Sequence, residues 1–284
     1  MSAFLMEGLG MKLRRHFNRA ASWSGRGLVI LLASGAVLLV VLPLGALGWR
    51  SYQGHAWTLM PQTAVQQAIR LSFGTTTVSL LLILLLGTPL AYLLARQTFP
   101  AKRLVNVLVQ LPIVLPPAVA GLALLITFGR RGVLGPTLDG LGFRITFTRT
   151  AVILAQTFVA MPFYVRSAQV GFRMVDREIE EAALVDGATP WWRFVYVTLP
   201  LASQAMISGA LLSWARALGE FGATILFAGN LPGRTQTMPL LIYSAFERSI
   251  DAAIWTALIL VGLAGLVLVL TFLLTREDDS SPTR

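Results

Sequence analysis

The sequence predicts an all-α polytopic membrane protein with six transmembrane helices. Of its 284 residues, 55% are hydrophobic and only 13% are charged, whereas an ordinary soluble domain carries about 25% charged residues. A helix needs roughly 20 mostly apolar residues to cross a bilayer. Five runs of that length contain no Asp, Glu, Lys or Arg: 27–49, 71–95, 104–129, 194–215 and 252–275.

A sixth span is predicted over 150–171, where Arg166 is the only charged residue. Arg166 lies near one end of this run, and a long cationic side chain there can reach the interface. Residues 51–69 are also free of charge, but their glutamines and His55 make the run too polar to span. The semi-polar segment 234–250 is predicted to be external or re-entrant, without being a seventh span.

Two of the six spans should not be simple straight helices. The third contains Pro112, Pro116 and Pro117, and proline inside a helix kinks or breaks it. Such a break faces protein or a water-filled cavity, or it is a simple irregularity of packing. The fifth span runs from residue 200 to residue 229, which is about 45 Å of helix at ~1.5 Å per residue against a core of about 30 Å. It must tilt strongly or break, and Gly219 and Gly222 are the natural places.

The distribution of Lys and Arg predicts that both termini are cytoplasmic. With the N-terminus inside, the tail before residue 28 and the segments 96–103 and 166–193 place more Lys and Arg inside than outside. The expected domains are a basic tail at 1–27, mobile or on the lipid surface, a six-helix domain at 28–275 and a C-terminal tail at 276–284. The net charge of +10 is dispersed over the span ends, so nucleic acid is not an expected partner.

Several chemistries have no residues to support them. The chain has no cysteine, hence no disulfide and no thiolate metal site. It has no H-E-x-x-H or G-x-S-x-G motif, and His16 and His55 lie outside the spans, so we expect neither a catalytic site nor a metal site. A P-loop needs G-x-x-x-x-G-K-[ST], which neither Lys12 nor Lys102 provides. Any ATP hydrolysis must therefore occur on another chain.

The loop at about 172–198 has more structure than a connection requires. Asp176 can cap a helix whose first turns are acidic, which suits the positive end of the helix dipole. Gly187 is a good helix stop, and Thr189-Pro190 can start a second helix before two tryptophans. We predict two short helices with a bend between them. They form either a docking surface or an amphipathic surface helix with no partner.

The same loop carries a recognisable signature. The residues Glu181, Ala182, Ala183, Gly187, Leu199 and Pro200 follow the pattern E-A-A, three residues, G, nine residues, I, one residue, L-P, with Val197 in place of Ile. This pattern resembles that of the permease subunits of type I ABC importers. The resemblance implies that the loop forms a coupling helix, which seats in a groove of an ATP-hydrolysing subunit. It further implies two ATPase copies and a bacterial or archaeal cell membrane.

A second stretch, 217–239, resembles the molybdate branch of this family through Gly219–Gly222, Ala228–Asn230 and Thr235–Pro239. Sulfate and thiosulfate permeases are similar, but we would expect a Glu near Gln236 in them. The likeness covers about 65–275. It implies import of molybdate, with tungstate hard to separate, an external oxyanion-binding protein and a second permease copy, most simply as a homodimer. It implies no cofactor on this chain, since ATP is used by the partner.

Candidate residues of the translocation path or gate come from the same stretch: Arg216, Glu220, Phe221, Gly222, Asn230, Thr235, Gln236 and Thr237. Arg216 and Glu220 lie four residues apart on one helix face and can pair. Alternatively, Arg216 meets the anion while Glu220 gates it. Neutral donors in two spans either line a conduit or join packed helices: Ser72, Thr75, Thr76, Thr77, Ser79, Gln156 and Thr157. The rival class, an autonomous channel or secondary transporter, would not need the loop signature.

Overall fold

The computed structural model describes the backbone of residues 2–54 and 62–275, and the side chains of 27–54 and 62–269. The chain divides into two units, Met1–His55 and Ala56–Arg284. In the first, α1 (Ser2–Gly54) is one continuous helix, of which Gly27–Gly54 is apolar enough to span a membrane. No break in the helix marks the tail boundary predicted at residue 27, and the predicted tail 276–284 lies outside the described residues.

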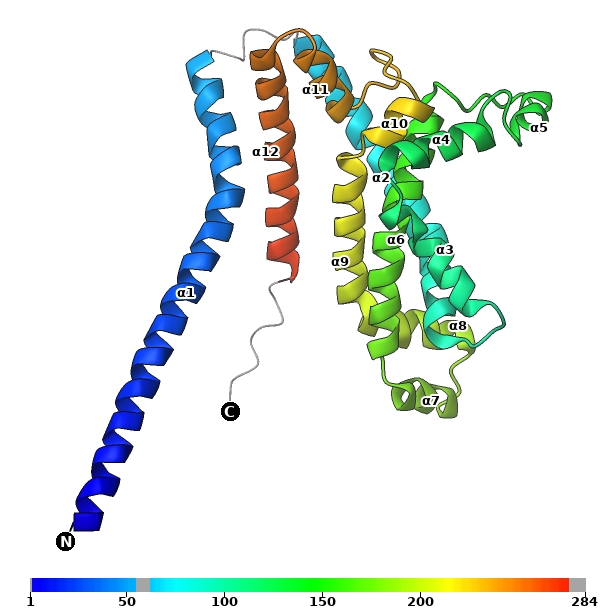
Figure 1. Ribbon diagram of the computed structural model, residues 1–284. Helices are drawn as coiled ribbons and strands as arrows, with labels where there is room; N and C mark the ends of the chain where they lie inside the picture. The colour runs from blue at the N-terminus through cyan, green and yellow to red at the C-terminus, as the bar shows by residue number, and fades with distance from the viewer. Residues whose placement is uncertain (1, 55–61, 276–284) are drawn as a thin grey trace. The chain divides into compact units, whose positions relative to one another are not determined.

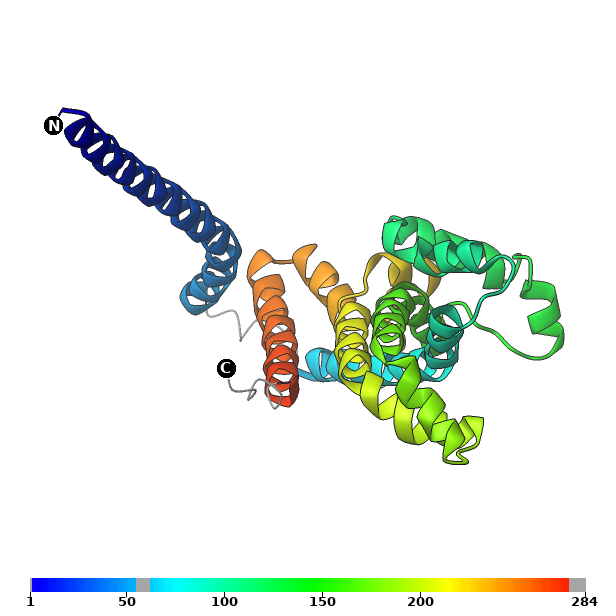
Figure 2. The ribbon, with the colours of Figure 1, turned by 90° about the horizontal axis from the view of Figure 1, so that it is seen from below.

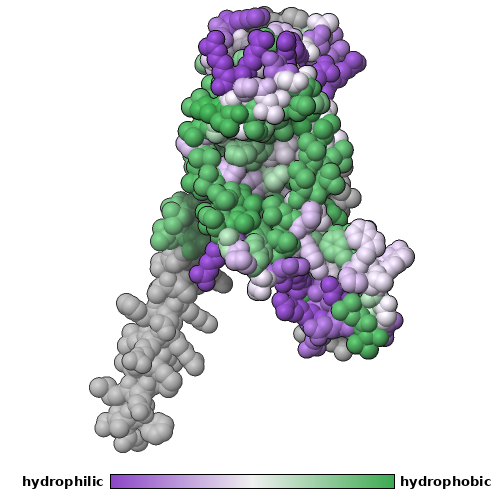
Figure 3. Space-filling model, turned by 90° about the vertical axis from the view of Figure 1, so that its right-hand side faces the viewer, coloured by the Kyte–Doolittle hydropathy of each residue, from purple (hydrophilic) through white to green (hydrophobic). Residues whose placement is uncertain are grey.

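The described part of the second unit is helical. Its elements are α2 (Gln62–Arg96), α3 (Lys102–Val114), α4 (Pro117–Phe128), α5 (Gly135–Gly140), α6 (Arg149–Met174), α7 (Arg177–Val185), α8 (Pro190–Arg193), the π-helical turn η2 (Phe194–Thr198), α9 (Leu199–Leu218), α10 (Gly222–Phe227), α11 (Met238–Phe246) and α12 (Ile250–Thr275). On the face that Figure 3 shows, hydrophobic residues form a belt between two polar ends, which is the pattern of a membrane-embedded domain.

Five helices of the described chain are long and apolar enough to cross a membrane, and α3 with α4 forms a further apolar pair bent by 117°. Leu115 is extended, as expected before Pro116, and Pro117 starts α4. The predicted break at the prolines is therefore confirmed. The bend is sharper than a kink, so the apolar run 104–129 is two helices of 13 and 12 residues. Each is about 20 Å long or less and too short to cross alone.

The fifth predicted span also breaks where expected. Helix α9 ends at Leu218, the residues around Gly219 leave the helix, and α10 begins at Gly222. At its other end the prediction needs a correction. The second short helix of the loop is not separate, because α8, η2 and α9 run on as one apolar helix over Pro190–Leu218. Segment 234–250 holds the nine-residue α11, which is too short to cross.

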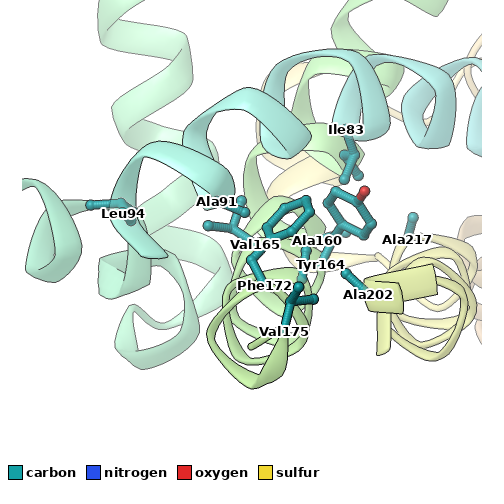
Figure 4. Packing of buried hydrophobic residues seen from close by; sticks show 11 residues of the cluster. Ile83, Ala91, Leu94, Ala160, Tyr164, Val165, Phe172, Val175, Ala202 and Ala217 are labelled. Carbon is teal, nitrogen blue, oxygen red and sulfur yellow. The ribbon is translucent and has the colours of Figure 1, made fainter. Parts of the chain in front are cut away.

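The core of the second unit lies between α2, α6 and α9 (Figure 4), where Ile83, Tyr164 and Phe172 are fully buried. Glycines allow the helices to approach closely. A Cβ added at Gly171 would lie 2.7 Å from the Ala205 Cβ, and one at Gly209 would lie 2.6 Å from the Ser167 Cβ. Small residues at helix crossings are the usual means of close packing in membranes.

Hydrogen bonds between helices join the same core. The Ser213 hydroxyl of α9 donates to the Ala160 carbonyl of α6 at 2.8 Å, and the Thr88 and Tyr164 hydroxyls lie 2.6 Å apart. A second cluster packs α4 and α10 against α6, and a third packs α11 and α12 against α2. Figure 2 shows α9 beside α6, with α12 next to α11. These contacts hold both broken spans against continuous ones.

The helix directions define two ends of the second unit (Figure 1). Helices α2 and α6 finish, and α9 starts, at the end that carries α7 and α8, which we call the α7 end. Helices α2 and α6 begin, and α9 leads into α10, at the other end, which we call the opposite end. The loop signature of the sequence lies at the α7 end, and the stretch 219–239 lies at the opposite end.

Candidate coupling site

Helix α7 begins and ends as its sequence predicts. The Asp176 carboxylate accepts the Glu178 backbone N–H at 3.0 Å, which makes Asp176 the N-cap. At the other end Gly187 has φ +89°. The Ala188 N–H reaches the Ala183 carbonyl, and the Gly187 N–H reaches the Leu184 carbonyl, which is the Schellman arrangement. The chain therefore turns sharply at Gly187, and α7 is a separate element of nine residues.

The chain restarts as predicted at Thr189. Its hydroxyl accepts the Trp192 N–H at 3.4 Å, and Pro190 occupies the first helical position. Leu199 and Pro200, the last residues of the signature, begin α9, with Leu199 half-buried and Pro200 exposed. The signature thus covers α7, its stop and the entry into α9.

A buried carboxylate attaches α7 to α2 and to the turn that leads into α9. Glu180 is only 7% exposed, and its Oε2 lies 3.1 Å from a guanidinium nitrogen of Arg96 in the last turn of α2. Its Oε1 accepts the Thr198 hydroxyl at 2.6 Å, from the turn that leads into α9. Arg96 also donates to the Val175 carbonyl at 2.8 Å, just after α6. Glu180 therefore bonds to α2 and to the turn that leads into α9, and its ion-pair partner Arg96 bonds to the residue that follows α6.

The exposure pattern of α7 departs from that of an ordinary surface helix at one buried acid and at several exposed apolar residues. Glu180 faces inward, whereas Val185 is 87% exposed and Ile179 is half exposed. Glu181, Ala182 and Gly187 are also exposed, and Ala183 is half-buried. Burying one acid while presenting apolar and small side chains is typical of a surface that another protein covers. This pattern favours the docking interpretation of the loop over a surface helix without a partner.

Sequence reasoning missed Glu180 and Arg96. Glu180 is one of several acids in the first turns of the predicted helix, and Arg96 is one of the cations counted in segment 96–103. Glu178, Glu180 and Glu181 are adjacent and chemically alike, so nothing in the sequence marks the one that faces α2. Glu180 and Glu181 both line a polar cavity of about 250 Å³, together with three arginines, Arg96, Arg177 and Arg193.

The predicted Arg216–Glu220 pair is present. An Arg216 guanidinium nitrogen lies 2.7 Å from Glu220 Oε2, and Glu220 is 1% exposed. Glu220 Oε1 accepts the Ala223 N–H at 2.7 Å, at the start of α10. Both carboxylate oxygens are therefore engaged, and Glu220 holds the two halves of the broken fifth span together. This geometry favours pairing over a free gating carboxylate.

The two residues after Glu220 also pack within the break. The Phe221 ring lies 5.3 Å from the Tyr243 ring of α11. A Cβ added at Gly222 would lie 2.6 Å from the Cβ of Pro117, so a larger residue would push α10 off the start of α4. The element Gly219–Gly222 thus joins the broken fifth span to the broken third span.

The remaining candidates form a hydrogen-bonded turn between α10 and α11. The Gln236 amide donates to Asn230 Oδ1 at 2.9 Å and to the Ser244 hydroxyl at 3.3 Å. The Thr235 hydroxyl accepts the Leu231 N–H at 3.0 Å, while the buried Thr237 hydroxyl has no hydrogen-bond partner among the described residues. The structure brings these residues together at the opposite end, and their role in translocation stays a prediction.

Most of the polar residues predicted in the spans make packing contacts. Thr75 and Thr76 donate to carbonyls of their own helix. Ser79 reaches the Ile153 carbonyl and Gln156 of α6, and Ser72 accepts the Met238 N–H of α11. Thr77 is exposed, and the Thr157 hydroxyl is buried without a hydrogen-bond partner among the described residues. The packing interpretation therefore fits better than a hydroxyl-lined conduit. Among the described residues, no group of three or more His, Asp and Glu could hold a metal ion.

Comparisons with known proteins agree with this geometry. Residues 87–276 match the family described as the inner membrane component of binding-protein-dependent transport systems. The chain is 42% identical over 244 residues to the molybdenum transport system permease protein ModB of Mycobacterium tuberculosis, a match covering 85% of this chain and 91% of that protein. It is 36% identical over 249 residues to the sulfate transport system permease protein CysW of Synechococcus elongatus, covering 87% and 85%.

The fold is that of solved ABC importers. A bacterial ABC transporter that imports alginate superposes with a TM-score of 0.72 at 17% identity, covering 89% of this chain and 95% of that chain. ATP hydrolysis in such importers takes place on a separate ATPase, which accounts for the missing P-loop. The matched region contains α7, the Glu180 contacts and the broken fifth span. This chain belongs to the binding-protein-dependent inner membrane components, the permease subunits of ABC importers.

Proposed function

We propose that this chain is the permease subunit of an ATP-driven importer that carries molybdate, with tungstate as a second cargo, into the cytoplasm. The coupling role rests on one observation, the exposure pattern of α7, which buries Glu180 and leaves small and apolar residues exposed for a partner to cover. The cargo rests on the 42% identity to a protein named as a molybdenum permease.

Sulfate or thiosulfate is the second candidate, supported by the 36% identity to a protein named as a sulfate permease. The turn at Gln236 argues against it. The Gln236 amide nitrogen donates to Asn230 and to Ser244. An ionised glutamate, which we expect near this position in sulfate permeases, cannot donate a hydrogen bond. The hydrogen bonds that this turn makes therefore use the amide nitrogen of Gln236 as donor.

The proposed mechanism starts at α7. This helix seats in a groove of the ATPase, and closure of two ATPases on ATP displaces it. The Glu180–Arg96 ion pair passes the displacement to α2, and the Glu180–Thr198 hydrogen bond passes it to α9. Because α2 and α9 pack on α6, the three helices move together and reorient the path.

The proposed assembly contains two ATPase copies, an external oxyanion-binding protein and a second copy of this chain. It lies in a bacterial or archaeal cell membrane with both termini of the permease in the cytoplasm. The permease itself holds no cofactor, and ATP is bound by the partner. An autonomous channel would move ions without these partners, so dependence on ATP separates the two classes.

The test is uptake by the assembled importer in proteoliposomes. We expect ATP-dependent and binding-protein-dependent uptake of labelled molybdate, with unlabelled tungstate competing about as well as molybdate and sulfate competing poorly. Equal competition by sulfate would move the assignment to the sulfate branch. Uptake by the permease alone, without ATP, would contradict the importer mechanism.

A further inference from the structure

A cavity of about 580 Å³ opens at the opposite end of the second unit, where α2 and α6 begin (Figure 1). Its volume is in the range of small-molecule sites, about 300–1,000 Å³. The lining residues of α2 recur at helical spacing from Gln67 to Val78. The cavity therefore follows one face of α2 for about three turns, or ~16 Å at ~1.5 Å per residue. Arg149 of α6 and Gly233 of the turn before α11 form the other side of its mouth.

Two arginines line this cavity, and no acid does. Arg70 comes from α2 and Arg149 from α6. Three other arginines of the second unit, Arg96, Arg144 and Arg216, each face a carboxylate. Neither Arg70 nor Arg149 forms an ion pair within the described part of the chain. Arg149 makes one long hydrogen bond, 3.5 Å to the Gly233 carbonyl, which extends its guanidinium across the mouth.

The position of Arg149 is not explained by helix stability. It is the first residue of α6, where the helix dipole is positive and an acid would be favoured. Under the proposed orientation both arginines also lie outside, where the positive-inside rule disfavours them. The two guanidiniums and the N-terminus of α6 thus add to one positive field at the mouth. Each arginine is unfavourable at its own position, judged by the helix dipole or by the positive-inside rule. An anionic ligand would compensate for this arrangement.

The lining changes character below the mouth. Leu71, Val78 and Ile153 are apolar, and the Thr75 hydroxyl donates to its own helix at the Leu71 carbonyl. A Cβ added at Gly74 would meet nothing within 4 Å, so the glycine leaves the middle of the cavity open. The only charged groups of the lining are therefore the two arginines, and the rest of the lining offers no second strong site for an anion.

We propose that Arg70 and Arg149 form a receiving site for a tetrahedral oxyanion dianion, which accepts the ion as the binding protein releases it. Guanidinium groups match such oxygens with paired hydrogen bonds. Gln67, on the same face of α2, adds a neutral amide donor. The site rests on the proposed oxyanion import and specifies where the ion first contacts the permease.

The test uses the complete importer in proteoliposomes with Arg70→Gln, Arg149→Gln and the double variant. Arg131→Gln is the matched control, because Arg131 is an exposed arginine of the loop after α4 that does not line the cavity. We expect molybdate uptake by the double variant to fall at least tenfold, which corresponds to ~1.4 kcal/mol or more. The ATPase activity stimulated by loaded binding protein should remain, because α7 is unchanged. Arg149→Lys, which keeps the positive charge, should retain part of the uptake that Arg149→Gln loses.

A steric variant tests the same site without changing charge. Gly74→Leu should slow uptake, because it fills open space in the cavity without meeting other atoms. Uptake by the double arginine variant equal to that of Arg131→Gln would overturn the receiving site and leave the importer function standing. Wild-type uptake of sulfate but not molybdate, with the same arginine dependence, would overturn the cargo and keep the site. Wild-type protein that imports neither ion would overturn both.

Discussion

At the residue scale, the contacts of Glu180 set it apart from its neighbours. Glu178 and Glu181 are exposed, while Glu180 lies between Arg96 and Thr198. A buried ion pair contributes little net stability, but removal of one partner leaves an uncompensated buried charge. The contact therefore specifies the position of α7 more than it stabilises the fold.

We expect Glu180→Ala to lower the free energy of unfolding by about 3–5 kcal/mol, because it leaves the Arg96 guanidinium without its carboxylate. Glu178→Ala is the control, since it removes an exposed acid from the same helix. Thermal unfolding of the detergent-solubilised permease measures both variants. Equal unfolding midpoints for the Glu180 and Glu178 variants would show that the Glu180 contact does not contribute to stability.

Arg216 and Glu220 show what residue spacing can predict. Their separation of four residues is sufficient to predict the pair, because neighbours on one helix face are determined locally. The second bond of Glu220, to the Ala223 N–H, could not be predicted in the same way. It exists because the helix breaks after Leu218 and restarts at Gly222.

At the element scale, the stop of α7 decides where the docking surface points. Gly187 has φ +89°, and a Cβ there would meet nothing within 4 Å. Backbone conformation, and not space, therefore selects glycine at this position. The same turn connects α7 to the continuous helix that begins at Pro190.

We expect Gly187→Pro to abolish ATP-driven uptake, because proline requires φ near −65° and removes the N–H that bonds to the Leu184 carbonyl. Gly187→Asn should retain most of the uptake, since asparagine tolerates the left-handed region. Both variants should insert normally, because the turn lies outside the spans. Similar uptake by the two would mean that the direction of α7 does not matter for transport.

The broken spans show the limit of sequence reasoning about elements. The prolines near 116 and the glycines near 220 marked both breaks, because these residues act on their own backbone. The bend of 117° between α3 and α4 was not predictable. It depends on packing against α6 and α10, where a Cβ at Gly121 would lie 2.8 Å from the Ala223 carbonyl oxygen.

At the scale of the whole molecule, the second unit carries two functional ends. The α7 end carries the proposed docking surface, and the opposite end holds the turn 229–237 and the cavity lined by Arg70 and Arg149. Helices α2, α6 and α9 connect the ends through one close-packed core. In the proposed mechanism, a displacement at α7 reaches the opposite end because these helices share one close-packed core.

We expect Glu181→Lys to prevent productive association with the ATPase, because Glu181 is exposed on the proposed docking surface, where its charge would face the partner. The variant should insert and fold, while ATP-dependent uptake falls to background. Asp139→Lys is the control, since it reverses an exposed carboxylate of α5, at the opposite end of the unit. Co-purification of the ATPase and uptake measure the effect, and unchanged uptake would refute the coupling role of Glu181.

The sequence by itself determined the membrane class, the spans, both breaks, the caps of α7 and the Arg216–Glu220 pair. Each depends on hydrophobic length, proline, glycine or neighbours within one helix turn. Only the tertiary structure decided that Glu180 meets Arg96, and that Arg70 and Arg149 share a cavity. The residues of each pair are about 80 positions apart, and their proximity depends on how α2, α6 and α7 are rotated and packed. Because Glu178, Glu180 and Glu181 are chemically alike, a single sequence does not show which of them faces another helix.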